Sequence, residues 1–560
     1  MSLNPEWSAW RVGSFRSRRW LLTWISWLAY YTVPLATGWI LKRIFDALDT
    51  SQSVAGLLVA LGVSEGVRML LFAGAIWVVI HWWVAALTML RTNMLHAQTV
   101  SGGPMRGRLP AGPAEAISRF HDDARDVVVW ADSWVDVSAN VGFAIGAIVI
   151  MASIDVGASL ITIVPIALVT VIIRWIRPRL YAADKADREA TAVVNSYLGE
   201  TFAAMLAFRL AAKEPAAIER LETHTEHRRQ TAVRHVVLEQ SLDGLTSTTT
   251  DLSIGLILLA LAPSVRRGDI TVGDLALFVS YAGVLGEVPR FASRLVTARE
   301  HANVSLARMA DMVALDRPHD VLRHPDISIA RGDPIVEREA DPSREPLARL
   351  HISGLTAHYP TTTTGVDEIN LVVERGSFIA VTGAVGSGKS TLLRALAGLI
   401  PRHAGSVRWN DEPIDDLGAW FVPPQSAHLP QVPRLFSESL ADNIALGRTD
   451  HSIDAVIEAT RMRVDLADMP EGLETRVGAR GLRLSGGQAQ RVATARSLLT
   501  DPELLLVDDL SSALDVETER ALWEHVRARE TTVIAVSHRQ FVLDMADDVY
   551  EMHDGRLIAR

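Results

Sequence analysis

The stretch Val381-Thr-Gly-Ala-Val-Gly-Ser-Gly-Lys-Ser-Thr391 decides the fold of this chain, because it fits the phosphate-loop pattern GxxxxGK followed by Ser or Thr. Gly383, Gly388, Lys389 and Ser390 occupy the required places. Glycines let such a loop turn its backbone N–H groups toward phosphate oxygens, while the lysine adds a positive charge and the serine a hydroxyl for Mg²⁺. The stretch therefore predicts a nucleotide site.

The residues on either side of the loop support this interpretation. Residues 377–382 form an apolar run that predicts a buried strand, and residues 392–397 have the apolar spacing of a helix. The loop would then lie at a helix N-terminus, where free N–H groups and the helix dipole attract phosphate. The nucleotide-binding residues expected here are Gly383, Ala384, Val385, Gly386, Ser387, Gly388, Lys389, Ser390 and Thr391.

Composition divides the 560 residues into two parts. The mean hydropathy is +0.18 and 49% of the residues are apolar, yet the chain after about residue 315 is ordinary soluble sequence. The apolar excess therefore lies earlier and predicts a membrane part. The formal charge of -10 supplies no basic field, so nucleic acid is not an expected partner. Because the chain has no cysteine, it can form neither a disulfide nor a thiolate metal site.

Six segments are expected to cross the bilayer, which takes about 20 apolar residues per helix. They are residues 20–41, 69–90, 137–154, 156–173, 252–265 and 275–286. Asp155 alone separates the third segment from the fourth, which predicts a tight hairpin. The edges of the last two segments bring in Asp243, Asp251, Asp274 and Glu287. These carboxylates either line a cavity or lie beyond the bilayer on long helices, and we expect the cavity.

The remaining sequence suggests how the domains are divided. Polar segments at residues 91–135 and 177–243 are expected to extend the spans into the cytoplasm as helices. Lys42 and Arg43 follow the first span on the opposite side, against the usual preference of basic residues for the cytoplasm. We therefore predict an all-α six-helix transmembrane domain at residues 1–315, a linker at 316–348 and an α/β P-loop ATPase domain at 349–560.

Two further motifs in the soluble part carry phosphate chemistry. Residues 504–507 form an apolar strand that ends in Asp508 and Asp509, and a carboxylate in that position can hold Mg²⁺ beside a bound triphosphate. Leu484-Ser-Gly-Gly-Gln488 opens a second helix whose free N–H groups would face phosphate. One chain therefore carries two half-sites for the same ligand.

With these motifs in this order, the chain resembles the ATP-binding cassette (ABC) half-transporters of the exporter type, and the resemblance covers essentially its whole length. In that family the phosphate loop of one subunit and the LSGGQ segment of another enclose ATP, so the resemblance implies a dimer. It also implies a multi-pass protein of the cell membrane with its nucleotide-binding domain in the cytoplasm. The LSGGQ residues expected to contact nucleotide are Ser485, Gly486, Gly487 and Gln488.

Four further residues take their expected roles from this resemblance. Tyr359 resembles the aromatic that stacks on adenine, and His538 resembles the switch histidine at the γ-phosphate. Gln431 is chosen over Gln425 as the glutamine near Mg²⁺, because residues 435–444 resemble the segment after that glutamine in exporters. Asp508 resembles the Mg²⁺ ligand, which gives an expected metal set of Ser390, Gln431 and Asp508. Residues 512–515 resemble the loop that contacts the opposite subunit.

Asp509 is the main departure from the family pattern, which has a glutamate as general base at this position. Aspartate is one methylene shorter, and a displacement of about 1 Å in a positioned group can cost on the order of 100-fold in rate. The expected catalytic residues Asp509, His538 and Gln431 would thus form a site that binds ATP well and hydrolyses it poorly. Some family members are heterodimers with one such degenerate site.

We therefore expect a heterodimeric half-transporter, with a homodimer as the alternative. A regulatory subunit that binds ATP with little turnover also fits Asp509, and an importer that uses the exporter fold fits the architecture. A soluble cassette ATPase that acts on DNA or ribosomes would lack the spans. The sequence does not identify the transported substrate.

Overall fold

The computed structural model describes residues 3–99, 113–313, 317–325, 344–359, 364–448, 452–478, 484–510 and 516–560. The chain forms two compact units. The helical unit comprises Met1–Asn93, Ala114–Asp311 and Pro318–Asp326. The α/β unit comprises Met94–Pro113, Met312–Arg317 and Ile327–Arg560.

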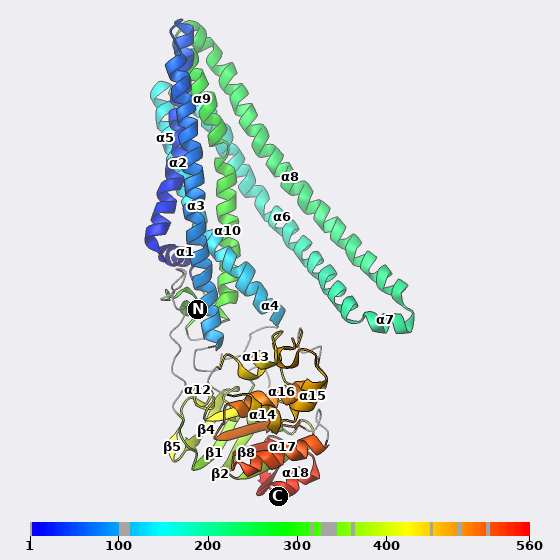
Figure 1. Cartoon of the computed structure of the whole chain (residues 1–560). Coiled ribbons are helices and arrows are strands. Elements are labelled where there is room, and N and C mark those ends of the chain that lie inside the picture. The colour runs from blue at the N-terminus through cyan, green and yellow to red at the C-terminus, as the bar shows by residue number, and fades with distance from the viewer. Residues whose placement is uncertain are drawn as a thin grey trace. The chain divides into compact units, whose positions relative to one another are not determined.

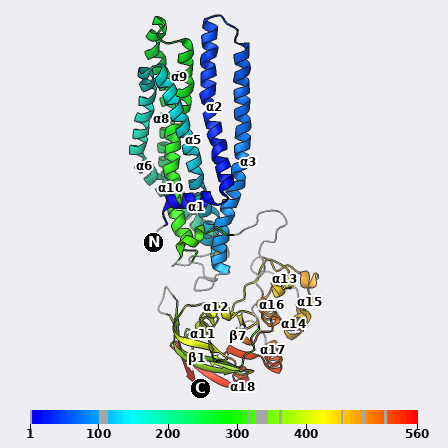
Figure 2. The same ribbon diagram turned by 90° about the vertical axis from the view of Figure 1, so that its left-hand side faces the viewer.

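Long helices make up the helical unit (Figures 1 and 2). In chain order they are α1 (Pro5–Ser14), α2 (Ser17–Asp49), α3 (Ala55–Thr99), α4 (Pro113–Ser118), the π-helix η1 (Arg119–Asp123), α5 (Ala124–Ile154), α6 (Val156–Ala203), α7 (Met205–Ala211), α8 (Glu214–Arg267), α9 (Val272–Leu285), α10 (Val288–Ala310) and the 3-10 helix η2 (Pro318–Leu322). Figure 1 shows α6 and α8 side by side as a long hairpin closed by α7. Five of the six predicted spans fall inside one helix, and the sixth, residues 275–286, extends one residue past α9, so the helical transmembrane fold is confirmed.

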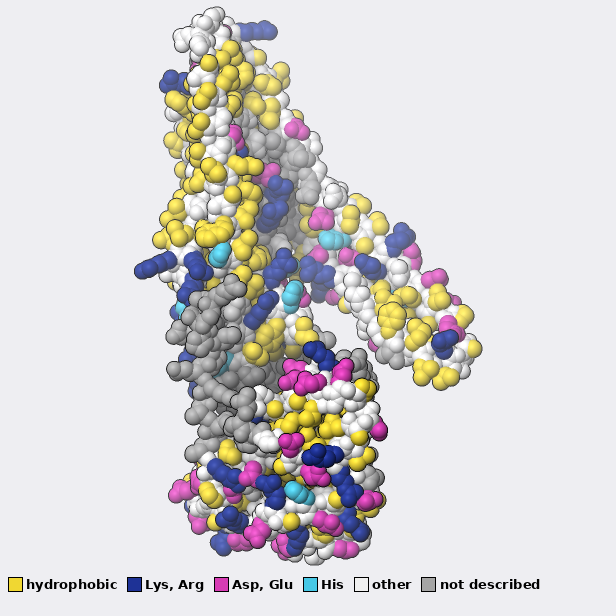
Figure 3. Space-filling view, in the orientation of Figure 1, with side chains coloured by type: hydrophobic (Ala, Val, Ile, Leu, Met, Phe, Trp, Pro, Cys, Tyr) yellow, Lys and Arg dark blue, Asp and Glu magenta, His cyan; other side chains and the backbone are white. Residues whose placement is uncertain are grey.

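The outer surface of these helices is apolar. Within the described residues, three stretches are long and apolar enough to cross a membrane: Ala55–Gln98, Glu115–Ile154 and Val272–Ala310. Met69, Leu70 and Trp77 of α3 are 73%, 75% and 67% exposed. Figure 3 shows hydrophobic side chains gathered over the long helices, whereas acidic and basic side chains are interspersed over the α/β unit. This difference is what a membrane part and a soluble part require.

Asp155 forms the predicted hairpin turn between α5 and α6. It is the only residue between the two helices, and its carboxylate accepts a hydrogen bond from Ala158 N at 2.6 Å. The side chain thus caps the first turn of α6, where backbone N–H groups lack partners. The predicted tight connection is confirmed.

Asp274 does not have the cavity-lining role that we expected for it. With Thr271 it forms a capping box at the start of α9, and its carboxylate also pairs with the ammonium of Lys42. Because only 6% of Asp274 is exposed, the pair is largely withdrawn from solvent. The same contact explains why Lys42 can follow the first span against the charge rule, since Asp274 neutralises it. Asp251 is exposed on α8.

The α/β unit combines strands and helices. They are β1 (Arg349–His358), β2 (Gly365–Glu374), β3 (Phe378–Thr382), α11 (Lys389–Leu396), β4 (Arg402–Trp409), β5 (Glu412–Pro413), α12 (Leu417–Trp420), β6 (Ser426–Leu429), α13 (Leu440–Ala445), α14 (Asp454–Ala459), α15 (Met462–Ala467), η3 (Gly472–Glu474), α16 (Gly486–Leu499), β7 (Leu504–Asp508), α17 (Val516–Ala528), β8 (Thr532–Val536), α18 (Gln540–Met545), β9 (Asp548–His553) and β10 (Arg556–Ala559).

Two sheets organise these strands. The first is four-stranded and antiparallel in the order β2-β1-β4-β5, and the second has the order β10-β9-β3-β8-β7-β6. In the second sheet β9, β3, β8, β7 and β6 run parallel, and β3, β7 and β8 are buried throughout. Strands buried on both faces read as continuous apolar runs, which is why residues 377–382 and 504–507 were recognisable in the sequence.

The central strands send alternate side chains into two different hydrophobic cores. Leu504 and Leu506 of β7 lie in a core shared with α11 and the four-stranded sheet. Leu505 and Val507 lie in a second core with α13, α14 and α16. The alternation follows from the two-residue period of a strand. It divides the α/β unit into two layers of packing on opposite faces of one sheet.

Part of the predicted linker is ordered and packed. Residues 326–343 lie outside the described residues, but residues 318–322 form η2 with Val321 and Leu322 fully buried. Asn93 Nδ2 donates to Val321 O at 2.9 Å and to Arg323 O at 2.7 Å. The apolar pair and the side-chain amide hold this segment against α3, a contact that the Pro-rich and Asp-rich composition did not suggest.

Candidate functional site

The predicted site residues converge on one edge of the six-stranded sheet. The phosphate loop follows β3, and Gln431 and His538 follow β6 and β8. Strand β7 ends at Asp508, and Asp509 comes directly after it. These strands are parallel neighbours in the order β3-β8-β7-β6, so their carboxyl ends lie along the same edge. Ligands of parallel α/β sheets bind at that edge. The strand order brings together residues that lie far apart in the sequence.

Three glycines of the phosphate loop adopt backbone conformations that side chains disfavour. Gly383, Gly386 and Gly388 have φ values of 135°, 85° and 108°. A Cβ on Gly383 would also lie 2.4 Å from Met552 O, so the loop could not pack there with a larger residue. Gly388 is the N-cap of α11, which places the free N–H groups of this helix at the loop. The loop thus has the geometry of an anion cradle.

Lys389 is folded back over its own loop. Its Nζ donates to Gly383 O at 2.9 Å and to Ala384 O at 2.7 Å. Burial lowers the pKa of Lys389, and the nearby carboxylates of Asp508 and Asp509 oppose that shift. The two carbonyls therefore hold the ammonium at the mouth of the loop, where a bound phosphate would lie.

The other phosphate-loop residues fall into a buried and an exposed group. Ser387 and Thr391 are buried, and within the described residues Ser387 Oγ has no hydrogen-bond partner. A buried hydroxyl without a partner is suited to donate to a ligand. Val385 lies at the tip of the loop and is 97% exposed.

Asp508 and Ser390 form the part of the site that fits Mg²⁺. Ser390 Oγ donates to Asp508 Oδ1 at 2.8 Å, although α11 and β7 are distant in the sequence. Burial raises the pKa of Asp508, while the hydrogen bond from Ser390 lowers it. Carboxylate and hydroxyl oxygens are the hard donors that Mg²⁺ prefers. The two residues can therefore share one metal ion beside a bound triphosphate.

Asp509 and Gln431 face each other across the strand ends. Gln431 Nε2 lies 3.5 Å from Asp509 Oδ2 at the limit of a hydrogen bond. Asp509 has a φ of 41°, and its N–H donates to Val536 O at 3.2 Å. Gln425 instead precedes β6, where its carbonyl accepts from Leu504 N, so it lies at the opposite end of that strand. The geometry thus favours Gln431 over Gln425.

Tyr359 and His538 lie at the margins of the site. Tyr359 packs partly buried against the core of α11, and its hydroxyl accepts a hydrogen bond from Arg394 Nη1 at 3.0 Å. His538 is exposed two residues beyond β8. The predicted contact loop at residues 512–515 lies outside the described residues.

The LSGGQ residues form the exposed N-terminus of α16. Ser485 Oγ accepts from Gln488 N at 3.2 Å, and Gln488 Oε1 accepts from Ser485 N at 2.9 Å, a reciprocal capping box. Asp465 also anchors this helix, because Arg491 of α16 donates hydrogen bonds to the two carboxylate oxygens of Asp465 at 2.7 and 2.8 Å. Gly486 is exposed, with nothing within 4 Å of an added Cβ. This helix end is rigid and open to a ligand.

A buried ion pair beside the site had no signal in the sequence. Glu519 of α17 has a side chain only 1% exposed, and its Oε2 lies 3.0 Å from Arg539 Nε, directly after His538. Burial raises the pKa of Glu519, and hydrogen bonding from Trp523 and the charge of Arg539 oppose the shift. The pair joins α17 to the loop that carries His538. Only the fold brings these two charges together, so no local motif predicts the pair.

Comparison with known families identifies both units. Residues 21–287 match the model described as the ABC transporter transmembrane region, and residues 366–512 match the ABC transporter model. The chain belongs to the ABC transporter family. It carries the membrane region and the nucleotide-binding domain in one polypeptide, which confirms the predicted half-transporter architecture of the exporter type.

Relatives of this ABC transporter include bacterial exporters and a flippase. It is 29% identical over 455 residues to the putative multidrug export ATP-binding/permease protein YgaD of Bacillus subtilis, a match that covers 79% of this chain and 75% of that protein. It is 28% identical over 454 residues to the ATP-dependent lipid A-core flippase of Chromobacterium violaceum, covering 79% and 74%. A solved bacterial Atm1-family ABC exporter with ATP bound has the same fold, with a TM-score of 0.74, 22% identity and coverage of 97% and 95%.

This ABC transporter is therefore a membrane protein that couples ATP to transport, with its nucleotide-binding domain in the cytoplasm. ABC half-transporters work as dimers, so a second half-transporter subunit is required.

Proposed function

We propose that this chain is one half of a heterodimeric ABC exporter, and that its own phosphate loop belongs to a site that binds ATP tightly and hydrolyses it slowly. The observation that carries the proposal is Asp509. It occupies the position of the general base at the end of β7, and its carboxylate lies 3.5 Å from Gln431 Nε2. A carboxylate one methylene shorter than glutamate stops short of an attacking water that glutamate would hold.

The other residues of the site support tight binding. The glycine cradle and Lys389 would hold the phosphates, and Tyr359 would stack on adenine. Ser390, Asp508 and Gln431 would hold Mg²⁺, which when bound neutralises charge on the phosphate oxygens. His538 would contact the γ-phosphate. Ser485, Gly486, Gly487 and Gln488 would then complete the partner subunit's site, where hydrolysis is faster.

ATP turnover separates a heterodimer from a homodimer. The purified chain alone should bind ATP and show almost no turnover, whereas the complex with its co-purified partner should hydrolyse ATP. Asp509→Glu should raise hydrolysis at this chain's own site on the order of 10- to 100-fold, because it restores the reach of the base. Asp415→Glu is the matched control, since Asp415 is exposed between β5 and α12, outside the six-stranded sheet. Robust turnover by the chain alone would exclude the heterodimer.

A further inference from the structure

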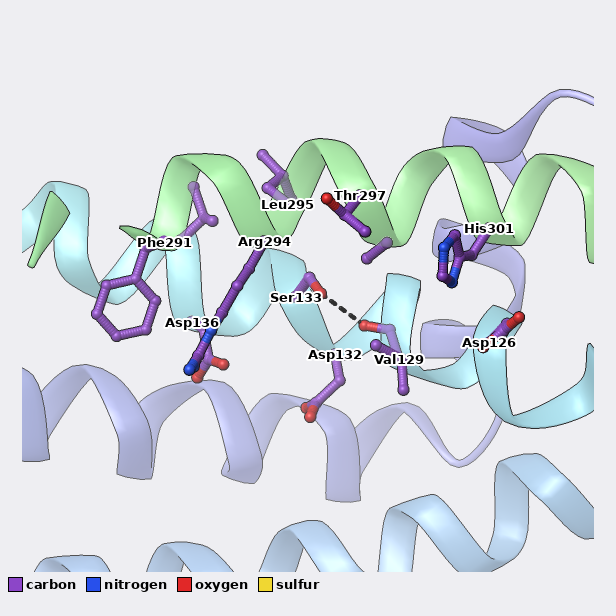
Figure 4. A pocket seen from close by; sticks show the side chains of 12 residues that line it. Asp126, Val129, Asp132, Ser133, Asp136, Phe291, Arg294, Leu295, Thr297 and His301 are labelled. Carbon is purple, nitrogen blue, oxygen red and sulfur yellow. Dashed lines mark hydrogen bonds between the residues drawn. The ribbon is translucent and has the colours of Figure 1, made fainter. Parts of the chain in front are cut away.

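A cavity of about 410 Å³ lies between α5 and α10 in the helical unit (Figure 4). One wall comes from α5, with Asp126, Asp132 and Asp136. The opposite wall comes from α10, with Phe291 and Arg294. The cavity belongs to the membrane half of an exporter and contains no residue of the nucleotide site, so its lining is a candidate contact for the transported substrate.

The charge of the cavity lining is negative. Three carboxylates face one guanidinium, a formal charge of -2 with His301 neutral. Asp132 and Asp136 are one helical turn apart, so they share a face of α5. Figure 4 shows Arg294 reaching across from α10 toward Asp136, with Asp132 one turn further along α5. Arg294 can offset one of the carboxylates, and the rest of the negative charge remains in the cavity.

These carboxylates lack the cation partners that similar groups elsewhere in the unit possess. Asp123 lies 3.4 Å from Arg308, and Asp274 pairs with Lys42. Within the described residues, no ion pair of 4.0 Å or less involves Asp132, Asp136 or Arg294. A half-buried carboxylate loses hydration and recovers little of that energy unless a cation approaches it. A positively charged ligand would supply the missing partner.

Besides the charged residues, the lining has three polar side chains, Ser133, Thr297 and His301, and an apolar and aromatic part. Val129, Val137, Leu295 and Ala298 complete the walls beside Phe291. The Phe291 ring meets Tyr31 edge to face with centroids 6.0 Å apart. Tyr31 in turn stacks with Trp27 at 5.7 Å, so an aromatic cluster continues from the cavity onto α2. Aromatic faces are electron-rich and attract cations, while the apolar walls bind hydrocarbon.

A bare metal ion fits this lining poorly. Within the described residues, no group of three or more His, Asp or Glu side chains is close enough together to hold a metal ion. A volume of about 410 Å³ with mostly apolar walls suits an organic molecule. An organic anion would meet the uncompensated carboxylates and be repelled.

We propose that this cavity is a substrate site for organic cations with an apolar body, with Asp132 and Asp136 as the residues that select positive charge. The inference rests on the proposed transport function and adds the class of substrate. Asp132 and Asp136 would bind the charged group, and Phe291, Leu295 and Val137 would contact the apolar body.

Two probes of nearly the same shape and opposite charge test the proposal. The full chain is placed in lipid nanodiscs without ATP, and binding of tetraphenylphosphonium and of tetraphenylborate is measured by equilibrium dialysis. Wild-type protein should bind the phosphonium ion at least 10-fold more tightly than empty nanodiscs do, and should show no such excess for borate. The double variant Asp132→Asn, Asp136→Asn should lower phosphonium affinity at least 10-fold, since each lost charge removes an attraction in a partly buried site.

Matched variants separate charge selection from misfolding. Asp132→Glu with Asp136→Glu keeps both charges and should retain phosphonium binding. Asp49→Asn with Glu189→Gln removes two exposed charges elsewhere in the helical unit and should leave binding unchanged. Binding of a fluorescent ATP analogue should be the same in every variant, which reports an intact nucleotide-binding domain, while phosphonium binding by the double glutamate variant reports an intact helical unit.

The outcomes also distinguish this inference from the proposed function. Equal excess binding of the two probes, or phosphonium binding that survives the loss of both aspartates, would overturn the cation site even if ATP turnover behaves as proposed. If fast ATP turnover by the chain alone excludes the heterodimer, cation binding measured without ATP still tests the cavity on its own terms.

Discussion

The phosphate loop and the LSGGQ segment both contain glycines and both lie at helix N-termini, yet they differ in packing and in hydrogen-bond partners. The phosphate loop is packed between strands, with Lys389 on its own carbonyls and Ser390 on Asp508. The LSGGQ segment stands exposed on the other face of the sheet, and its polar side chains pair with each other and with Asp465. One motif is assembled with its metal-binding carboxylate, and the other presents only a rigid helix end.

This difference teaches why one chain makes half of each site. The two helices pack in separate hydrophobic cores, α11 with the four-stranded sheet and α16 with α13 and α14. A bound triphosphate needs cation, metal ligand and N–H groups together, and the phosphate loop already has all three. In the proposed arrangement, the LSGGQ helix adds N–H groups to a second nucleotide by meeting the phosphate loop of another subunit. Substitutions in the two motifs should therefore affect different sites.

The largest expected effect comes from Lys389→Ala. The ammonium is held at the loop by two carbonyls, and its loss removes a charge-assisted contact to phosphate worth about 2–3 kcal/mol. ATP affinity of this chain should fall on the order of 100-fold, as measured by titration with a fluorescent ATP analogue. Arg375→Ala, an exposed basic residue of the same domain, is the control and should leave affinity unchanged. Unaltered binding in Lys389→Ala would show that the loop does not hold phosphate.

The second expected effect, from Ser485→Ala, is smaller and falls on the other site. Loss of the cap should cost about 1 kcal/mol of helix stability and misalign the N–H groups of Gly486 and Gly487. ATP turnover of the dimer should decrease on the order of 10-fold, while ATP binding by this chain's own phosphate loop stays the same. Ser485→Thr keeps a capping hydroxyl and should retain most of the turnover. A drop in this chain's own ATP affinity would contradict the assignment of the two motifs to different sites.

The smallest expected effect comes from Glu519→Gln, a change outside both motifs. It removes the negative charge that faces Arg539, and because the Arg539 side chain is still 23% exposed we discount the cost to about 1–2 kcal/mol. The melting temperature of the α/β unit should drop by a few degrees, and turnover should fall about threefold as the His538 loop loosens. Glu517→Gln, with an 82% exposed side chain on the same helix, is the control. Lower turnover without any change in melting temperature would point to a direct role in chemistry.

Much of the nucleotide site could be predicted because its chemistry is local. A phosphate cradle needs glycines, lysine and a hydroxyl within a few residues, so Gly383 to Ser390 could be recognised without a fold. Asp508 could be recognised because a buried parallel strand is a continuous apolar run that ends at the carboxylate. The spans could be predicted from hydropathy, and the tight turn at Asp155 could be predicted because this residue alone separates two of them.

The expectations that failed depended on distant partners. Asp274 was expected to line a cavity. Instead, its carboxylate pairs with a lysine more than two hundred residues away in the sequence and caps the start of α9. Residues 316–348 were expected to form a linker, and the sequence did not indicate that Asn93 would fix the segment of Val321 and Leu322. Side chains reach such partners only after the helices have packed, so sequence periodicity does not predict these contacts.

The sequence by itself determined the phosphate loop, the LSGGQ helix start, the strand-end carboxylates and the six apolar segments, because each is specified by residues close together in the chain. Tertiary structure alone decided the rest. Strand order placed Gln431 against Asp509, the packing of α17 beside β8 paired Glu519 with Arg539, and the packing of α5 against α10 set Phe291 and Arg294 opposite the aspartates of α5. Contacts between distant segments follow from the packing of whole helices and strands, which no single stretch of sequence encodes.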